Sequence, residues 1–140
     1  CKEAHQIIFA FQESYDDFSF KIQIHKVKGG DEIKIKDLKV KIYQMRHYVA
    51  VGVNRILHPD PTVGYRFIYG GKSVAISGDT GICSGLKNLV EGADLALIDS
   101  TLNKDEETDE LLDKLHLSKE KAEVIGKLAK KYILIHRQGK

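Results

Sequence analysis

The sequence predicts an α/β fold in which a mostly antiparallel sheet carries helices on its outer face. In the first half of the chain, several segments alternate apolar and polar residues at every second position, which is the period of a half-buried strand. From residue 84 the apolar positions take helical spacing, and helical segments alternate with short apolar runs. This order of elements favours a sheet with helices packed on its outside.

The first half predicts a series of short strands. They share the two-residue alternation, or a short apolar run between turn signals, and they cover residues 18–27, 33–35, 38–42, 63–69 and 72–77. The pair Gly70-Gly71 predicts a hairpin turn between the last two strands. The apolar run at 7–11 fits a strand or the start of a helix.

The second half predicts two helices and two buried strands. The first helix begins near residue 84 and stops at Gly92. The second is capped by Ser118, and its apolar positions follow helical spacing: Ala122, Ile125, Ala129 and Tyr132. The strands cover residues 95–99 and 133–135, and the acidic segment 103–113 is a loop or a solvated helix.

The chain has 140 residues, 42% hydrophobic and 30% charged, which suits one compact domain or part of a larger one. A net charge of +2 gives no strong electrostatic case for binding nucleic acid or an anionic membrane. No apolar run approaches the roughly 20 residues of a membrane span, so we expect no membrane partner. Two cysteines form no disulfide framework, which favours a reducing, cytoplasmic compartment. The first residue is Cys1 rather than Met, so we expect a truncated or processed product.

Three apolar strands lead into a residue that suits a metal ion, and a fourth ends at Asp99. Residues 40–45 run into His47, residues 74–77 run into Asp79, and residues 133–135 run into His136. Strands hold side chains rigidly at their ends while the following loops leave space for a ligand. Imidazole and carboxylate groups together suit zinc, manganese or iron. The combination predicts a metal site at the ends of the strands.

Five segments in order resemble the second half of metallo-β-lactamase-fold hydrolases, and most closely the tRNase Z branch. They are residues 64–67 (GYRF), 71–80 (GKSVAISGDT), 93–101 (ADLALIDST), 116–118 (HLS) and 133–136 (ILIH). The resemblance covers residues 31–136. It implies that residues 1–140 form the C-terminal half of an αββα metallo-β-lactamase domain. It also implies a metal-dependent hydrolase that uses a metal-activated water, with a phosphodiester as the expected substrate.

The resemblance implies roles for individual residues. Asp79 matches the carboxylate that bridges two divalent ions, zinc first and manganese or iron as alternatives. His136 matches the terminal histidine on the second ion, and His47 matches the histidine on the first. His116 matches the residue that donates a proton to the leaving oxygen, which suits a side chain with a near-neutral pKa. Asp99 matches the acidic residue that orients His116.

The chain departs from the family pattern in several places. The family's His-x-His-x-Asp-His motif, which supplies four ligands, is absent, so we expect a partner: the missing N-terminal half or a second copy of the chain. His47 lies further before Gly64 than is usual, and His58 has the better spacing, so His58 is the alternative ligand. The long arm with which tRNase Z grips tRNA is missing between Arg66 and Gly71.

These patterns leave several functions open. The first is a phosphodiesterase acting on a small phosphodiester or RNA. The alternatives are a tRNA 3′-end endonuclease, a thioester or sulfate-ester hydrolase, and an inactive half-domain that functions only when paired with an N-terminal fragment. The near-neutral charge and the missing arm disfavour a dedicated tRNA processor, because long nucleic acids demand several phosphate contacts.

Overall fold

The computed structural model describes residues 24–51, 56–102, 108 and 114–136, and at 49–51 and 56–60 it describes the backbone alone. The elements follow one another as β1 (Glu32–Ile35), β2 (Leu38–Gln44), β3 (His47–Val51), β4 (Ile56–Asp60), β5 (Val63–Tyr69), β6 (Lys72–Ile76), α2 (Ser84–Val90), β7 (Leu95–Asp99), α4 (Lys119–Gly126) and β8 (Tyr132–Ile135). Within this part of the chain, no helix is long and apolar enough to cross a bilayer.

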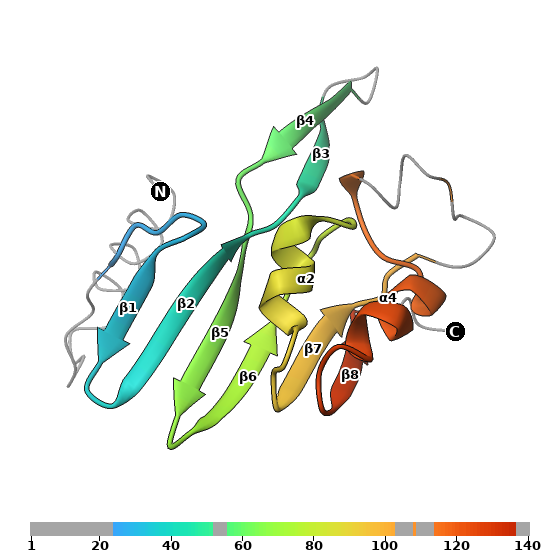
Figure 1. Cartoon of the computed structure of the whole chain (residues 1–140). Helices are drawn as coiled ribbons and strands as arrows, with labels where there is room; N and C mark the ends of the chain where they lie inside the picture. Colours follow the sequence, from blue (N-terminus) through green and yellow to red (C-terminus); the bar gives the residue numbers. More distant parts are fainter. Residues whose placement is uncertain (1–23, 52–55, 103–107, 109–113, 137–140) are drawn as a thin grey trace, which may run out of the picture.

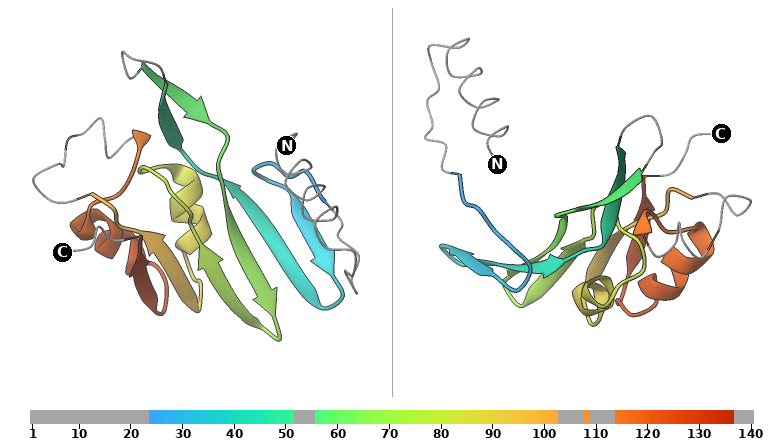
Figure 2. Two further views of the ribbon diagram at one scale, coloured as in Figure 1. Left: turned by 180° about the vertical axis from the view of Figure 1, so that it is seen from behind. Right: turned by 90° about the horizontal axis from the view of Figure 1, so that it is seen from above.

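Six strands form one sheet in the order β1-β2-β5-β6-β7-β8 (Figure 1). The pairs from β1 to β6 are antiparallel, and β6, β7 and β8 run parallel to one another. Parallel neighbours need a crossover connection, and α2 and α4 provide the two that this sheet requires. Both helices lie on the same side of the sheet (Figure 2). The predicted α/β fold with a mostly antiparallel sheet and outer helices is confirmed.

The core lies between α2, α4 and the sheet. Leu86, Leu89 and Val90 of α2 are fully buried, and the strands opposite them present small residues such as Ala75 and Ala96. Small residues let the helices approach the sheet closely. The approach is tight enough that a Cβ on Gly64 would lie 2.7 Å from Leu89 Cδ2.

The opposite face of the sheet is apolar. Residues that face each other across neighbouring strands point to the same side. One row on this side contains Ile33, Val40, Phe67, Val74 and Leu95, and the next contains Ile42, Tyr65, Ile76, Leu97 and Ile133. We call these ten residues the open face, because α2 and α4 pack on the other side of the sheet; Val40 and Ile42 are nevertheless buried.

The sequence suggested that His47 closes strand β2, but the structure places it elsewhere. β2 ends at Gln44, and His47 begins β3, which pairs with β4 in a separate two-stranded hairpin that projects beyond the sheet (Figure 1). This inserted hairpin explains the long spacing between His47 and Gly64. Sequence analysis missed it because Pro59 argues against a strand; a two-stranded hairpin consists of edge strands, where proline is tolerated.

Two further predictions were wrong. The second helix ends at Gly126, and Tyr132 begins β8 instead of continuing the helix. A Cβ on Gly126 would lie 2.5 Å from the Tyr132 ring, so the chain reverses here and the ring packs over the glycine. The strand predicted at 18–27 is absent from residues 24–27, and residues 18–23 lie outside the described part of the chain. The predictions for 7–11 and for 103–113, except residue 108, also fall outside it.

Asp94 links the amino-terminal ends of the parallel strands. Its Oδ2 accepts the Ser73 backbone N–H at 2.8 Å, and its Oδ1 accepts from Lys130 Nζ at 2.9 Å. Lys72 Nζ lies 3.5 Å from Oδ1. The hydrogen bond from Lys130, followed by that from Ser73, holds the pKa of this carboxyl well below its usual range.

Asp94→Asn should therefore lower the midpoint of thermal unfolding, and the loss should depend on pH. A carboxyl whose pKa is depressed by folding contributes stability above its unfolded value of about 3.9 and loses it as pH falls further. The gap between wild type and variant should be full at pH 6–7 and should narrow below about pH 4. Circular dichroism melts across this range measure it, and a gap that stays constant down to pH 3 would contradict the assignment.

Candidate metal centre

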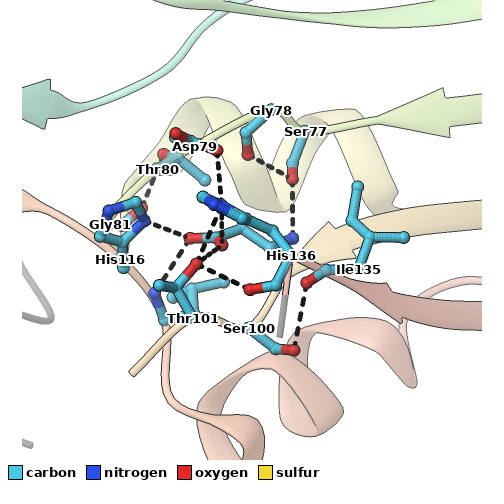
Figure 3. A network of polar contacts seen from close by, with 12 residues as sticks. Ser77, Gly78, Asp79, Thr80, Gly81, Ser100, Thr101, His116, Ile135 and His136 are labelled. Carbon is cyan, nitrogen blue, oxygen red and sulfur yellow. Dashed lines mark hydrogen bonds and ion pairs between the residues drawn. The ribbon is translucent and has the colours of Figure 1, made fainter. Parts of the chain in front are cut away.

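The carboxyl ends of β6, β7 and β8 bring four titratable side chains together (Figure 3). Asp79 follows β6, Asp99 ends β7, His136 follows β8, and His116 lies in the segment that leads into α4. One ligand atom from each lies within 4.8 Å of all the others. Parallel strands place their carboxyl ends at one edge of the sheet, so side chains far apart in the sequence meet there.

Asp99 is buried at the centre of this group. Its Oδ2 accepts from His116 Nδ1 at 3.0 Å and from the Leu117 backbone N–H at 3.3 Å. Its Oδ1 accepts from the Thr101 hydroxyl, and its own N–H donates to Ser77 Oγ at 3.0 Å. A buried carboxylate needs such donors to offset its desolvation. Because both oxygens already accept hydrogen bonds from the protein, the geometry suits an orienting residue better than a metal ligand.

His116 takes its orientation from Asp99. The hydrogen bond to Asp99 raises the pKa of this imidazole; burial opposes the rise, and the charges of Asp99 and Asp79 add to it. With Nδ1 donating to Asp99, Nε2 is the nitrogen left for a substrate or a ligand. The His116 ring stands edge-on to two other histidines, 5.3 Å from His47 and 5.6 Å from His136 between centroids.

Asp79 and His136 form the open side of the group. Their side chains are 46% and 53% exposed, and Asp79 Oδ1 lies 3.0 Å from His136 Nδ1. Nδ1 of His136 also lies 3.0 Å from Thr101 Oγ1 and 3.5 Å from Asp99 Oδ1. His136 has a φ of +54°, which is uncommon for a residue other than glycine.

The loop that carries Asp79 is tied to the segment that leads into His47. The buried Thr80 hydroxyl accepts the Arg46 backbone N–H at 3.3 Å and donates to the Gly81 carbonyl at 2.9 Å. The Gly81 N–H donates to the Arg46 carbonyl at 2.7 Å. One set of backbone contacts therefore sets the distance between Asp79 and His47.

The structure brings together four of the six residues singled out from the sequence, namely Asp79, Asp99, His116 and His136. His47 lies beside them, half-buried against the His116 ring, but outside the four-residue group. The backbone of His58 pairs with that of Val49 in the β3–β4 hairpin, where the structure describes the backbone alone at both residues. The choice between His47 and His58 as the ligand therefore stays a prediction.

Thr101, to which the sequence pattern assigned no role, contacts both Asp99 and His136. Its position two residues after a strand-ending carboxylate is the signal that could have found it.

The donor set fits a divalent metal ion. A carboxylate and an imidazole on the open side, with a second imidazole beside them, are the ligand types that zinc, manganese and iron take in proteins. Asp79 can bind through either oxygen, which suits a ligand shared by two cations.

Residues 3–136 match the family described as "Beta-lactamase superfamily domain". The chain belongs to this family. Among solved structures, it is similar to the metallo-beta-lactamase fold protein YhfI from Bacillus subtilis, with a TM-score of 0.60 and 15% identity over 79% of this chain and 41% of that one. The short form of human tRNase Z gives a TM-score of 0.56 and 24% identity over 76% of this chain and 39% of that one.

Zinc-bound PqqB from Methylobacterium extorquens gives a TM-score of 0.59 and 18% identity over 79% of this chain and 44% of that one. The chain thus spans less than half the length of these three proteins. No match was found among curated protein sequences. These similarities confirm the metallo-β-lactamase fold that the sequence motifs suggested.

Asp79→Ala should remove metal from the protein. If Asp79 is shared by two cations, its loss should lower the occupancy of both positions together. Elemental analysis of the purified protein measures this, with Asp37→Ala, an exposed aspartate in the β1–β2 turn, as the matched control. Unchanged metal content in Asp79→Ala would remove this residue from the ligand set.

Proposed function

We propose that this chain is part of a metal-dependent hydrolase that cleaves phosphodiester bonds. The family supplies the hydrolase class. The observation that carries the narrower proposal is the Asp99–His116 pair, whose 3.0 Å hydrogen bond lies beside the open carboxylate and imidazole of Asp79 and His136. This arrangement sets a proton donor next to a metal-ligand set.

His116 is the proposed general acid. Asp99 accepts from Nδ1, so the proton available for transfer is on Nε2, and the hydrogen bond to Asp99 raises the pKa of this imidazole, which favours its protonated form. A phosphodiester leaves an alkoxide or phenoxide, which needs a proton as it departs. A thiolate is a weaker base and needs less help, so an oriented acid of this kind favours an ester of phosphate over a thioester.

The proposed metal ligands on this chain are Asp79, His136 and His47, with His58 as the alternative to His47. The proposed cofactor is a pair of divalent ions, zinc first, because imidazole and carboxylate are its ordinary ligands. When bound, such ions activate water and stabilise negative charge on phosphoryl oxygens. The similar structure of PqqB is described as zinc-bound, which supports zinc over manganese or iron.

A small phosphodiester is the proposed substrate class. The likeness to human tRNase Z favours RNA 3′-end cleavage as a second candidate. A net charge of +2, however, offers little general attraction for a long polyanion.

We also propose that further polypeptide, an N-terminal half or a second copy, covers the open face. The two rows are contiguous and apolar, most of their side chains are only partly buried, and Ile133 is 52% exposed, so further polypeptide could remove apolar surface from water here. The proteins of similar structure are more than twice as long as the part this chain spans.

His116→Ala should slow cleavage of a chromogenic phosphodiester by about 10²–10⁴-fold in the complete enzyme, and the metal content should stay unchanged. The loss should shrink for leaving groups of low pKa, such as 4-nitrophenolate, and grow for alkyl esters. Steady-state rates over a leaving-group series measure it.

His25→Ala, which changes an exposed histidine, is the matched control and should keep full activity. Loss of metal in His116→Ala would instead make this residue a ligand. An intact enzyme that ignores diesters but cleaves thioesters or sulfate esters would overturn the proposed reaction.

Ile133→Lys should weaken the association that covers the open face by at least about tenfold, because it sets a charge on an apolar contact. Val124→Lys is the matched control: both residues are exposed and apolar, at 52% and 62%, but Val124 lies on α4. Sedimentation over a concentration series measures the association. A 140-residue wild-type chain that stays monomeric and well folded at all concentrations would count against a covered face.

A further inference from the structure

We propose that Thr101 is a positioning residue, which holds the ring of His136 at Nδ1 and holds the strained backbone of the same residue in place. The inference rests on the proposed role of His136 as a metal ligand. It assigns a function to a hydroxyl that belongs to neither the ligand set nor the proton donor.

The first step concerns the hydrogen of Thr101. A hydroxyl has one hydrogen, and Thr101 Oγ1 has three partners: Asp99 Oδ1 at 2.5 Å, the His136 carbonyl at 2.9 Å, and His136 Nδ1 at 3.0 Å. The carboxylate and the carbonyl can only accept. The hydrogen is therefore directed at these two oxygens, chiefly at the charged one, which gives the shorter and stronger bond.

The second step concerns His136. Since the Thr101 hydrogen points chiefly at Asp99, Oγ1 serves as an acceptor beside His136 Nδ1. The other two groups near this nitrogen, Asp79 Oδ1 at 3.0 Å and Asp99 Oδ1 at 3.5 Å, are acceptors as well. Thr101 and Asp79 together therefore fix the His136 ring at Nδ1, and partners of this kind orient a histidine that binds a metal.

The third step concerns the backbone. His136 stands at φ +54° directly after β8, a conformation that costs energy for a residue with a Cβ. The Thr101 hydrogen is shared between Asp99 and the His136 carbonyl, and its weaker component, at 2.9 Å to that carbonyl, helps to hold this conformation. One hydroxyl thus reaches both the ring and the main chain of the same residue.

The neighbouring residue gives a matched comparison. Ser100 donates its N–H to the Ile135 carbonyl at 3.1 Å and its hydroxyl to the same oxygen at 3.3 Å. Ser100 therefore joins the ends of β7 and β8 as Thr101 does, but its hydroxyl donates to Ile135, one residue before His136. A general loosening of this strand end should follow from either change, whereas an effect on His136 should follow from Thr101 alone.

The test uses Thr101→Val, which keeps the branched shape and loses the hydroxyl, beside Thr101→Ser and Ser100→Ala. Zinc affinity of the complete protein, measured by competition with a chelating indicator, should fall about 10–100-fold in Thr101→Val. Thr101→Ser should restore it to within a few fold, and Ser100→Ala should leave it unchanged. Equal affinity of Thr101→Val and wild type, or no rescue by serine, would overturn the inference.

A second measurement reads the ring of His136 without metal. Long-range proton–nitrogen spectra of the apo protein should give His136 the same ring nitrogen shifts in wild type and Thr101→Ser, and altered shifts in Thr101→Val. Unchanged His136 shifts in Thr101→Val would refute the role of the hydroxyl. Zinc binding that depends on Thr101 in a protein that does not cleave diesters would sink the proposed reaction and leave this inference standing.

Discussion

Asp99 is the buried charge around which the candidate site is organised. Its two oxygens accept from His116, the Leu117 backbone and Thr101, so a loop, a strand end and the start of the segment into α4 all depend on one carboxylate. Removing a partner from such a carboxylate would leave a buried charge without compensation, which is costly. The Asp99 carboxylate is therefore held in one place, and it positions the side chains that bind to it. His116 receives its tautomer and its raised pKa from Asp99 directly, and His136 is linked to it through Thr101.

The sheet explains why this charge lies where it does. Three parallel strands end at one edge, and each delivers a polar residue just as its apolar run stops: Asp79, Asp99 and His136. The two crossovers that parallel pairing demands place α2 and α4 on one face and leave the edge accessible. At the other end of the same strands, Asp94 accepts hydrogen bonds from Ser73 and Lys130 and so links the strand ends. One end of the parallel strands is thus built for stability and the other for chemistry.

Much of this could be predicted from the sequence, because strand alternation and strand-ending polar residues are local signals. The meeting of Asp79, Asp99, His116 and His136 follows from the order of motifs, and the contact between Asp99 and His116 was predicted with it. What escaped prediction depends on distant partners. Pro59 argues against the strand that pairs in the β3–β4 hairpin. Tyr132 fits the helical spacing of the sequence, but its ring packs over Gly126 and the chain reverses. Thr101 matters because His136 lies beside it in the fold. None of these can be seen within one segment.

The open face and the candidate site are continuous. Alternation along β7 puts Leu95, Leu97 and Asp99 on the same side of the sheet, away from α2 and α4. The register places Ile135 directly opposite Asp99 on that side, immediately before His136. A polypeptide that covers the apolar rows as far as Leu97 would therefore reach the four-residue group around Asp99. The same contact that removes apolar surface from water would bring new side chains to Asp79 and His136. In the proposed enzyme, a polypeptide that covers this face would therefore also be placed to complete the ligand set, because the apolar rows lead to the site.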